Sequence, residues 1–128
     1  METKRPKVLV IDDEPTHADT LAMVLNISGF EAIAAHSATH GVDLAMQTAF
    51  DYLVTDVVMN GMNGIDAAIA IHRLLPNCRI LLISGNNDTS PLLDAAIAQG
   101  HAFDILAKPV HPTVLLSYLR APAGTIPE

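Results

Sequence analysis

Reactive polar residues stand at the ends of several short apolar segments in this chain of 128 residues. Asp12 and Asp13 follow the run KVLVI, Asp56 follows YLVT, Ser84 follows RILLI and Lys108 follows FDILA. If these runs are parallel strands, their carboxyl ends meet at one edge of the sheet, where ligands bind in open α/β proteins. We therefore predict that three carboxylates, one hydroxyl and one ammonium group share one shallow pocket.

Three carboxylates in one pocket repel one another. Two unit charges 4 Å apart interact by about 4 kcal/mol at an effective dielectric constant near 20, so either one carboxyl keeps a proton or a cation binds. Oxygen ligands without nearby His or Cys suit Mg²⁺. A metal, a lysine and a hydroxyl around an aspartate are suited to stabilising a phosphoryl group. In this interpretation Asp56 is the nucleophile, Lys108 neutralises phosphoryl oxygens and Ser84 donates a hydrogen bond to one of them.

The elements that must position these groups alternate along the chain. Apolar runs predict strands at 7–12, 31–36, 52–56, 79–85 and 103–108. Helical spacing of apolar residues, with Pro, Ser and Gly near the ends, predicts helices at 15–29, 38–48, 64–75, 90–100 and 111–120. Strands this apolar are typical of a parallel sheet with helices on both faces. The second strand ends without a reactive group, as expected for an outer edge.

Composition narrows the class of protein. Half of the residues are hydrophobic and the net charge is −7, which favours a single globular domain and argues against direct nucleic-acid binding. No apolar run is long enough for a membrane helix and METKRPK lacks the core of a signal peptide, so we expect a cytoplasmic protein without a membrane segment. Cys78 is the only cysteine, so no internal disulfide forms. Residues 121–128 show no periodicity and read as a disordered tail or the start of a linker.

Four segments resemble a known family. VLVIDDEP, LVTDVVMNGMNGID, LLISG and ILAKPV, in this order and spacing, resemble the receiver domain of bacterial two-component response regulators over roughly residues 6–120. The resemblance implies a flavodoxin-like α/β fold, doubly wound, with a five-stranded parallel sheet of order 2-1-3-4-5 and five helices, in which residues 1–120 form the receiver domain. It also implies that Asp56 accepts a phosphoryl group from a sensor histidine kinase or a histidine phosphotransfer protein.

The resemblance further implies a set of metal ligands. Asp13 and Asp56 would bind Mg²⁺ directly, the backbone carbonyl of Val58 would add a third ligand, and Asp12 would act through water. Taken alone, Asp12 and Asp13 would also suit a cap of the following helix, and Ser84 a hydrogen bond to backbone.

A second group of residues corresponds to the switch of the family. Ser84 and Lys108 match its switch hydroxyl and its lysine, and Lys108–Pro109 resembles its cis peptide. The position three before the lysine, commonly Tyr or Phe, is Ile105 here, so the aromatic half of the usual output switch is missing. Asn60 stands where the family usually has proline, which bears on the stiffness of that loop.

The leading hypothesis is a phosphoacceptor signalling switch whose phosphorylation changes the surface formed by residues 90–120. We expect no enzymatic activity beyond its own phosphorylation and dephosphorylation, an output partner that the sequence does not identify, and a homodimer through residues 90–120. The main alternative is a receiver-like interaction module that docks a partner without phosphorylation. A flavin carrier would need a hydroxyl- and glycine-rich loop where DDEP stands, and an aspartyl phosphohydrolase usually has a second acid where Val58 stands.

Overall fold

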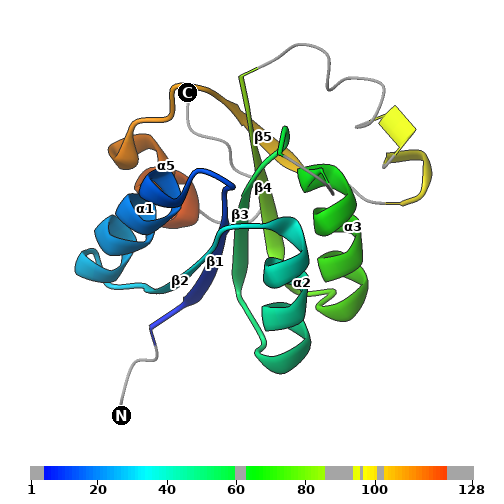
Figure 1. Cartoon of the computed structure of the whole chain (residues 1–128), viewed down its shortest axis with the longest axis horizontal. Helices are drawn as coiled ribbons and strands as arrows, with labels where there is room; N and C mark the ends of the chain where they lie inside the picture. Colours follow the sequence, from blue (N-terminus) through cyan, green and yellow to red (C-terminus); the bar gives the residue numbers. More distant parts are fainter. Residues whose placement is uncertain (1–4, 60–62, 86–93, 96, 101–102, 121–128) are drawn as a thin grey trace.

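The chain folds around one five-stranded parallel sheet in the order β2-β1-β3-β4-β5 (Figure 1). The computed structural model describes residues 5–59, 63–85, 94–95, 97–100 and 103–120. The strands are β1 (Lys7–Ile11), β2 (Glu31–Ala35), β3 (Tyr52–Asp56), β4 (Arg79–Ser84) and β5 (Asp104–Ala107). The predicted strand order is confirmed, and β2 is one of the two edge strands, as expected from its lack of a reactive end.

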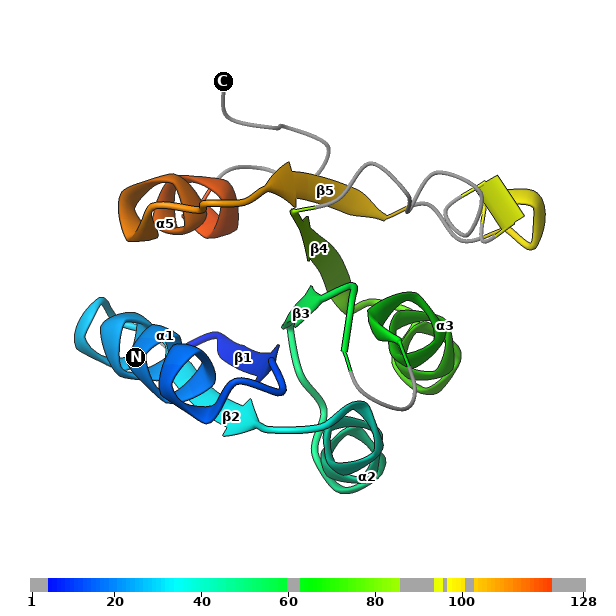
Figure 2. The same ribbon diagram turned by 45° about the horizontal axis from the view of Figure 1, so that its top comes forward.

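Helices cover both faces of the sheet, as predicted. They are α1 (Pro15–Ile27), α2 (Ala38–Gln47), α3 (Gly64–Leu74) and α5 (Pro112–Arg120). Figure 2 shows α1 and α5 on one face and α2 and α3 on the other. Bounds are thus defined for four helices rather than the predicted five. Much of the predicted helix at 90–100 lies outside the described residues, although 94–95 and 97–98 within it are helical. In the described part of the chain, no helix is long and apolar enough to span a membrane.

Local sequence explains where the helices begin and end. Ser37 caps α2 by accepting a hydrogen bond from the backbone of His40, and Asn63 caps α3 in the same way. Gly29 has a φ of +102° just beyond the end of α1, a conformation that favours glycine. The residue before α1 is Glu14, so the alternative in which Asp12 or Asp13 caps this helix is wrong.

Two apolar clusters, one on each face, hold these layers together. Alternate residues of each strand point to opposite faces, so both faces of a buried parallel strand are apolar. In β1, for example, Leu9 and Ile11 belong to the cluster that also contains buried residues of α2 and α3. Val8 and Val10 belong to the cluster that contains buried residues of α1 and α5. The sheet is therefore fixed between its helices and provides a rigid edge.

Polar contacts hold α5 against the amino ends of the strands. The Tyr118 hydroxyl donates a short hydrogen bond to the Asp104 carboxylate at the start of β5. The Arg79 guanidinium lies over the Tyr118 ring, 5.0 Å from its centre, and 5.6 Å from the centre of the Tyr52 ring. Burial and the hydrogen bond to Asp104 together raise the pKa of the Tyr118 hydroxyl above its ordinary range.

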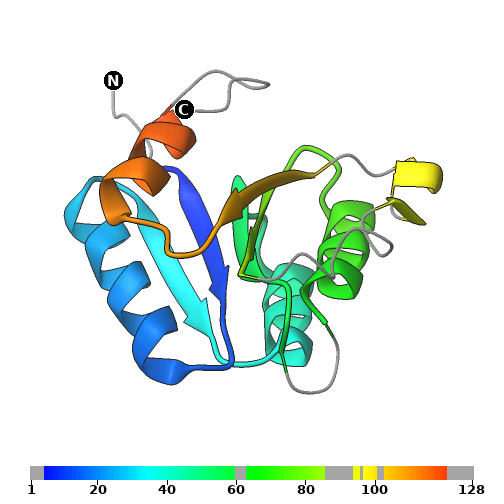
Figure 3. The same cartoon turned by 90° about the horizontal axis from the view of Figure 1, so that it is seen from above.

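The parallel arrangement gathers the strand ends at one edge. Figure 3 shows β1 (blue) and β2 (cyan) side by side with their arrowheads at the same end. β1 also pairs with β3 in a register that sets Ile11 opposite Thr55. Residues that follow these two positions therefore start at the same level of the sheet.

Candidate functional site

Three aspartates meet at the carboxyl edge of the sheet. Asp12 and Asp13 follow β1, Asp56 is the last residue of β3, and each offers a carboxylate oxygen within 4.8 Å of those of the other two. Asp56 is only 8% exposed, whereas Asp12 and Asp13 are half-buried. The structure therefore brings together the three carboxylates that the sequence placed at strand ends.

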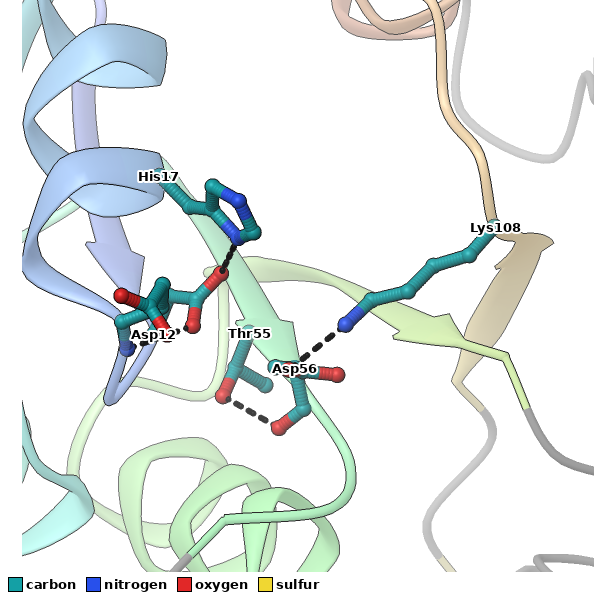
Figure 4. Close-up of polar contacts among 6 residues, drawn as sticks. Asp12, His17, Thr55, Asp56 and Lys108 are labelled. Carbon is teal, nitrogen blue, oxygen red and sulfur yellow. Dashed lines mark hydrogen bonds and ion pairs between the residues drawn. The ribbon is translucent and has the colours of Figure 1, made fainter.

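Lys108 provides the positive charge of the site. Its Nζ lies 2.8 Å from Oδ2 of Asp56 (Figure 4), and their side chains are 40% and 10% exposed. The loop after β5 is held to β4 because the Lys108 N–H donates to the Ser84 carbonyl over 2.9 Å. Ser84 is buried at the end of β4, and the Lys108–Pro109 peptide is cis, as the resemblance implied. Ser84 at the end of β4 and Lys108 directly after β5 therefore lie at the same edge of the sheet as the aspartates.

The backbone around Asp56 is tightly held. The buried Thr55 hydroxyl donates to the Asp56 carbonyl over 3.0 Å. The Val57 N–H donates to the Ile83 carbonyl over 3.1 Å, and the Gly64 N–H donates to the Val57 carbonyl over 2.8 Å. Neighbours in β4 and α3 therefore fix the start of the loop that follows Asp56 and leads to Val58, a residue that is 61% exposed.

Sequence reasoning missed His17, which stands at the rim of the site. Its Nδ1 lies 3.8 Å from Oδ2 of Asp12 (Figure 4), and the imidazole is 69% exposed. A His in the first turn of a helix that directly follows an acidic pair is the signal that would have pointed to this contact. Beside the site, between α1 and the segment after β5, runs a groove of about 640 Å³ whose lining includes Asp12, His17, Lys108 and Pro109.

Of the predicted output residues, Ser84 and Pro109 lie beside the site, and Ile105 belongs to the apolar core. Ile105 is half-buried in β5 and packs, together with Phe103, against the apolar cluster on the α2 and α3 face. The Phe103 and His72 rings pack edge to face, with their centroids 5.9 Å apart. Asn60 and residues 86–93 lie outside the described residues.

The donor set suits a hard divalent cation. The cluster offers carboxylate oxygens only, and Lys108 compensates the charge of Asp56 while Asp12 and Asp13 add two more negative charges. Mg²⁺ binds such sites through a few carboxylates and keeps several waters. The residues present therefore fit a magnesium ion at this edge of the sheet.

A parallel sheet of order 2-1-3-4-5 defines the flavodoxin-like class of α/β proteins, in which ligands bind at the carboxyl edge of the strands, where this chain gathers its acidic cluster and Lys108. Comparison with known proteins specifies the class. The family model for the response regulator receiver domain matches residues 8–120. The chain therefore belongs to the response regulator receiver domain family.

Individual relatives agree with this assignment. The DNA-binding response regulator MtrA of Mycobacterium tuberculosis is 29% identical over 122 residues, which cover 94% of this chain and 52% of that protein. A nitrate/nitrite response regulator protein homolog of Haemophilus influenzae is 31% identical over 119 residues, covering 89% of this chain and 55% of that protein. The chain thus spans about half the length of the curated relatives it matches.

Solved structures show the same fold. A response regulator receiver domain protein from Clostridium thermocellum is 31% identical with a TM-score of 0.75, covering 86% of this chain and 87% of that one. A response regulator protein from Burkholderia pseudomallei, solved with a phosphorylated aspartic acid, calcium ion and citrate, is 29% identical with a TM-score of 0.78. That match covers 90% of this chain and 66% of the other.

Proposed function

We propose that Asp56 is the phosphoacceptor of a two-component signalling switch. The observation that carries the proposal is the ion pair of 2.8 Å between Lys108 and the nearly buried Asp56, beside the oxygens of Asp12 and Asp13 within 4.8 Å. This arrangement presents a carboxylate nucleophile next to a cation and a metal-binding cluster, which are the parts that phosphoryl transfer needs. The phosphorylated aspartic acid and calcium ion in the Burkholderia relative support it.

Each residue has a proposed role in holding the ion. Asp13 and Asp56 would bind Mg²⁺ directly, the Val58 backbone carbonyl would be a third protein ligand, and Asp12 would act through water. The bound ion supplies neutralisation of charge that develops on the phosphoryl oxygens. The carboxylates of Asp12 and Asp13 would repel the negatively charged phosphoryl group of the donor. Phosphoryl transfer therefore requires a cation that neutralises these two carboxylates.

The donor is a phosphohistidine of a sensor histidine kinase or of a histidine phosphotransfer protein. An Asp56 carboxylate oxygen attacks phosphorus and forms the new O–P bond. The bond from phosphorus to the donor's imidazole nitrogen breaks, and the nitrogen keeps the electron pair. The Lys108 ammonium, already beside the acceptor carboxylate, then stabilises the phosphoryl oxygens, to which Ser84 donates a hydrogen bond.

The phosphorylated state is read out at the surface formed by residues 90–120. The phosphoryl group adds roughly 1.5 to 2 negative charges and new acceptor oxygens at Asp56. The hydroxyl of Ser84 and the ammonium of Lys108 move toward that charge, and the Lys108 N–H bond to the Ser84 carbonyl couples the loops after β4 and β5. Pro109 and the half-buried Ile105 transmit this shift, with Ile105 in place of the usual aromatic residue.

The surface formed by residues 90–120 is the proposed contact site for partner proteins. Residues 90–120 contact a further copy of this chain or another output partner, and exposed Ile97 and Val114 contribute apolar area there. MtrA is named a DNA-binding response regulator, whereas this chain carries a net charge of −7 and is proposed to act without direct nucleic-acid contact. Residues 1–120 form the functional domain, residues 121–128 form a tail or linker, and catalysis is limited to the phosphorylation and dephosphorylation of this domain itself.

Intact-mass measurement tests the proposal. The protein is incubated with acetyl phosphate and Mg²⁺, and we expect the mass of one phosphoryl group to be added. The gain should disappear with EDTA and in Asp56→Asn. Asp51→Asn is the matched control, because Asp51 precedes β3 at the opposite end of the strand and accepts a hydrogen bond from the Lys7 backbone. A wild-type protein that binds Mg²⁺ but gains no mass would instead favour the module that docks without phosphorylation.

A further inference from the structure

The first turn of α3 lies unusually close to the backbone of Asp56. A Cβ atom built on Gly64 would lie 1.8 Å from the Asp56 carbonyl oxygen, 2.8 Å from its carbonyl carbon and 3.0 Å from the Val57 Cα. Contacts of a Cβ below 3.0 Å essentially never occur, so a side chain at position 64 would move these atoms apart by about 1.2 Å. Gly64 does not have a positive φ, so the need for glycine here is one of space and not of backbone conformation.

We infer that Gly64 is a positioning residue for the phosphoryl-transfer site, an inference that rests on the proposed role of Asp56. Two bonds leave the Asp56 backbone little room to yield: the Thr55 hydroxyl donates to its carbonyl, and the Gly64 N–H donates to the next carbonyl, that of Val57. Any displacement of the Asp56 carbonyl also moves the Asp56 carboxylate and the backbone that leads to Val58. The Asp56 carboxylate and the Val58 carbonyl are both proposed ligands of the metal.

The obstacle at another buried glycine is of a different kind. A Cβ on Gly41 in α2 would lie 2.3 Å from Cδ1 and 2.7 Å from Cγ1 of Ile11. Those atoms belong to the end of a side chain, which another rotamer can move without displacing the backbone. Gly41→Ala therefore perturbs core packing, while Gly64→Ala displaces the acceptor itself.

The comparison of these two substitutions is the test. Mg²⁺ affinity is measured by isothermal titration calorimetry, the rate of phosphorylation by acetyl phosphate is measured by intact mass, and the melting temperature is measured by circular dichroism. We expect both variants to melt at a lower temperature. Because a displacement of about 1 Å at a reacting group costs roughly 100-fold in rate, Gly64→Ala should be phosphorylated about 100-fold more slowly and bind Mg²⁺ at least tenfold more weakly. Gly41→Ala should stay within about twofold of wild type in both, because its clash is with a side chain.

Equal Mg²⁺ affinity and equal phosphorylation rate in Gly64→Ala and Gly41→Ala would overturn the inference. If Gly64→Ala does not fold, Thr55, whose hydroxyl donates to the same carbonyl, gives a second test. Thr55→Val should slow phosphorylation roughly three- to tenfold, the worth of one hydrogen bond, and Thr55→Ser should retain the wild-type rate. Equal rates in that pair would also overturn it. If wild type is not phosphorylated at all, the proposed function fails, and the Mg²⁺ affinities still decide whether Gly64 positions the cluster.

Discussion

Replacing Asp13 with Asn should stabilise the metal-free protein while removing its response to Mg²⁺. Asp13 is one of three residues whose carboxylate oxygens lie within 4.8 Å of one another. Two unit charges at that separation repel by about 3.5 kcal/mol at an effective dielectric constant near 20. Asp13 is half-buried and Lys108 already offsets the charge of Asp56. Water and Lys108 therefore make the repulsion that the substitution removes smaller than this value. We expect Asp13→Asn to raise the free energy of unfolding by about 1 to 2 kcal/mol.

Urea denaturation followed by far-ultraviolet circular dichroism measures this effect, first in EDTA at low ionic strength and then with excess Mg²⁺. The wild type should gain stability with Mg²⁺, because a ligand that binds only the folded state stabilises it. Asp13→Asn should gain little. Asp43→Asn, at an exposed position of α2, controls for the loss of one negative charge from the whole chain. An Asp13→Asn protein no more stable in EDTA than Asp43→Asn, or one that Mg²⁺ stabilises as much as wild type, would refute the electrostatic account.

Two further predictions concern groups remote from the acidic cluster. Tyr118→Phe removes the hydroxyl that donates to Asp104 and should lower the free energy of unfolding by about 1.5 to 3 kcal/mol in urea titrations; an unchanged urea midpoint would contradict this. Burial, with a smaller contribution from Asp51, raises the pKa of the Cys78 thiol from 9.0 to about 12. A raised pKa in the folded state means that stability is complete below pH 9 and is lost as the pH rises from 9 toward 12. Cys78→Ala should flatten this alkaline loss, and an identical pH profile of the urea midpoint would show that the thiol does not contribute.

The positions of the aspartates were predictable because topology alone dictates them. Asp12 and Asp13 follow one apolar run and Asp56 ends another, and parallel strands place such ends at one edge whatever the side chains do there. The position of β2 at an edge followed from its lack of a reactive end, whereas the full strand order came from the resemblance to the receiver family. The meeting of the aspartates and the edge position of β2 needed only the apolar pattern and the general behaviour of α/β sheets.

Contacts that depend on how elements approach one another were not predictable. The sequence places Lys108 near the site, but the 2.8 Å contact with Asp56 depends on the reach of one long side chain from β5 across β4. Gly64 reads in the sequence as the start of a helix, and only the packed structure shows that α3 approaches the Asp56 backbone through it. His17 reads as an exposed helical residue, and its place beside Asp12 depends on the angle at which α1 leaves β1.

Site mapping of the phosphoryl group tests the central claim most directly. The wild-type chain is phosphorylated with acetyl phosphate and Mg²⁺ and then reduced with borohydride, which converts an aspartyl phosphate to homoserine. Proteolysis and mass spectrometry then read the modified position. The account predicts homoserine at position 56 and at no other aspartate. Homoserine at Asp12 or Asp13, or no modification in a protein that binds Mg²⁺, would contradict it.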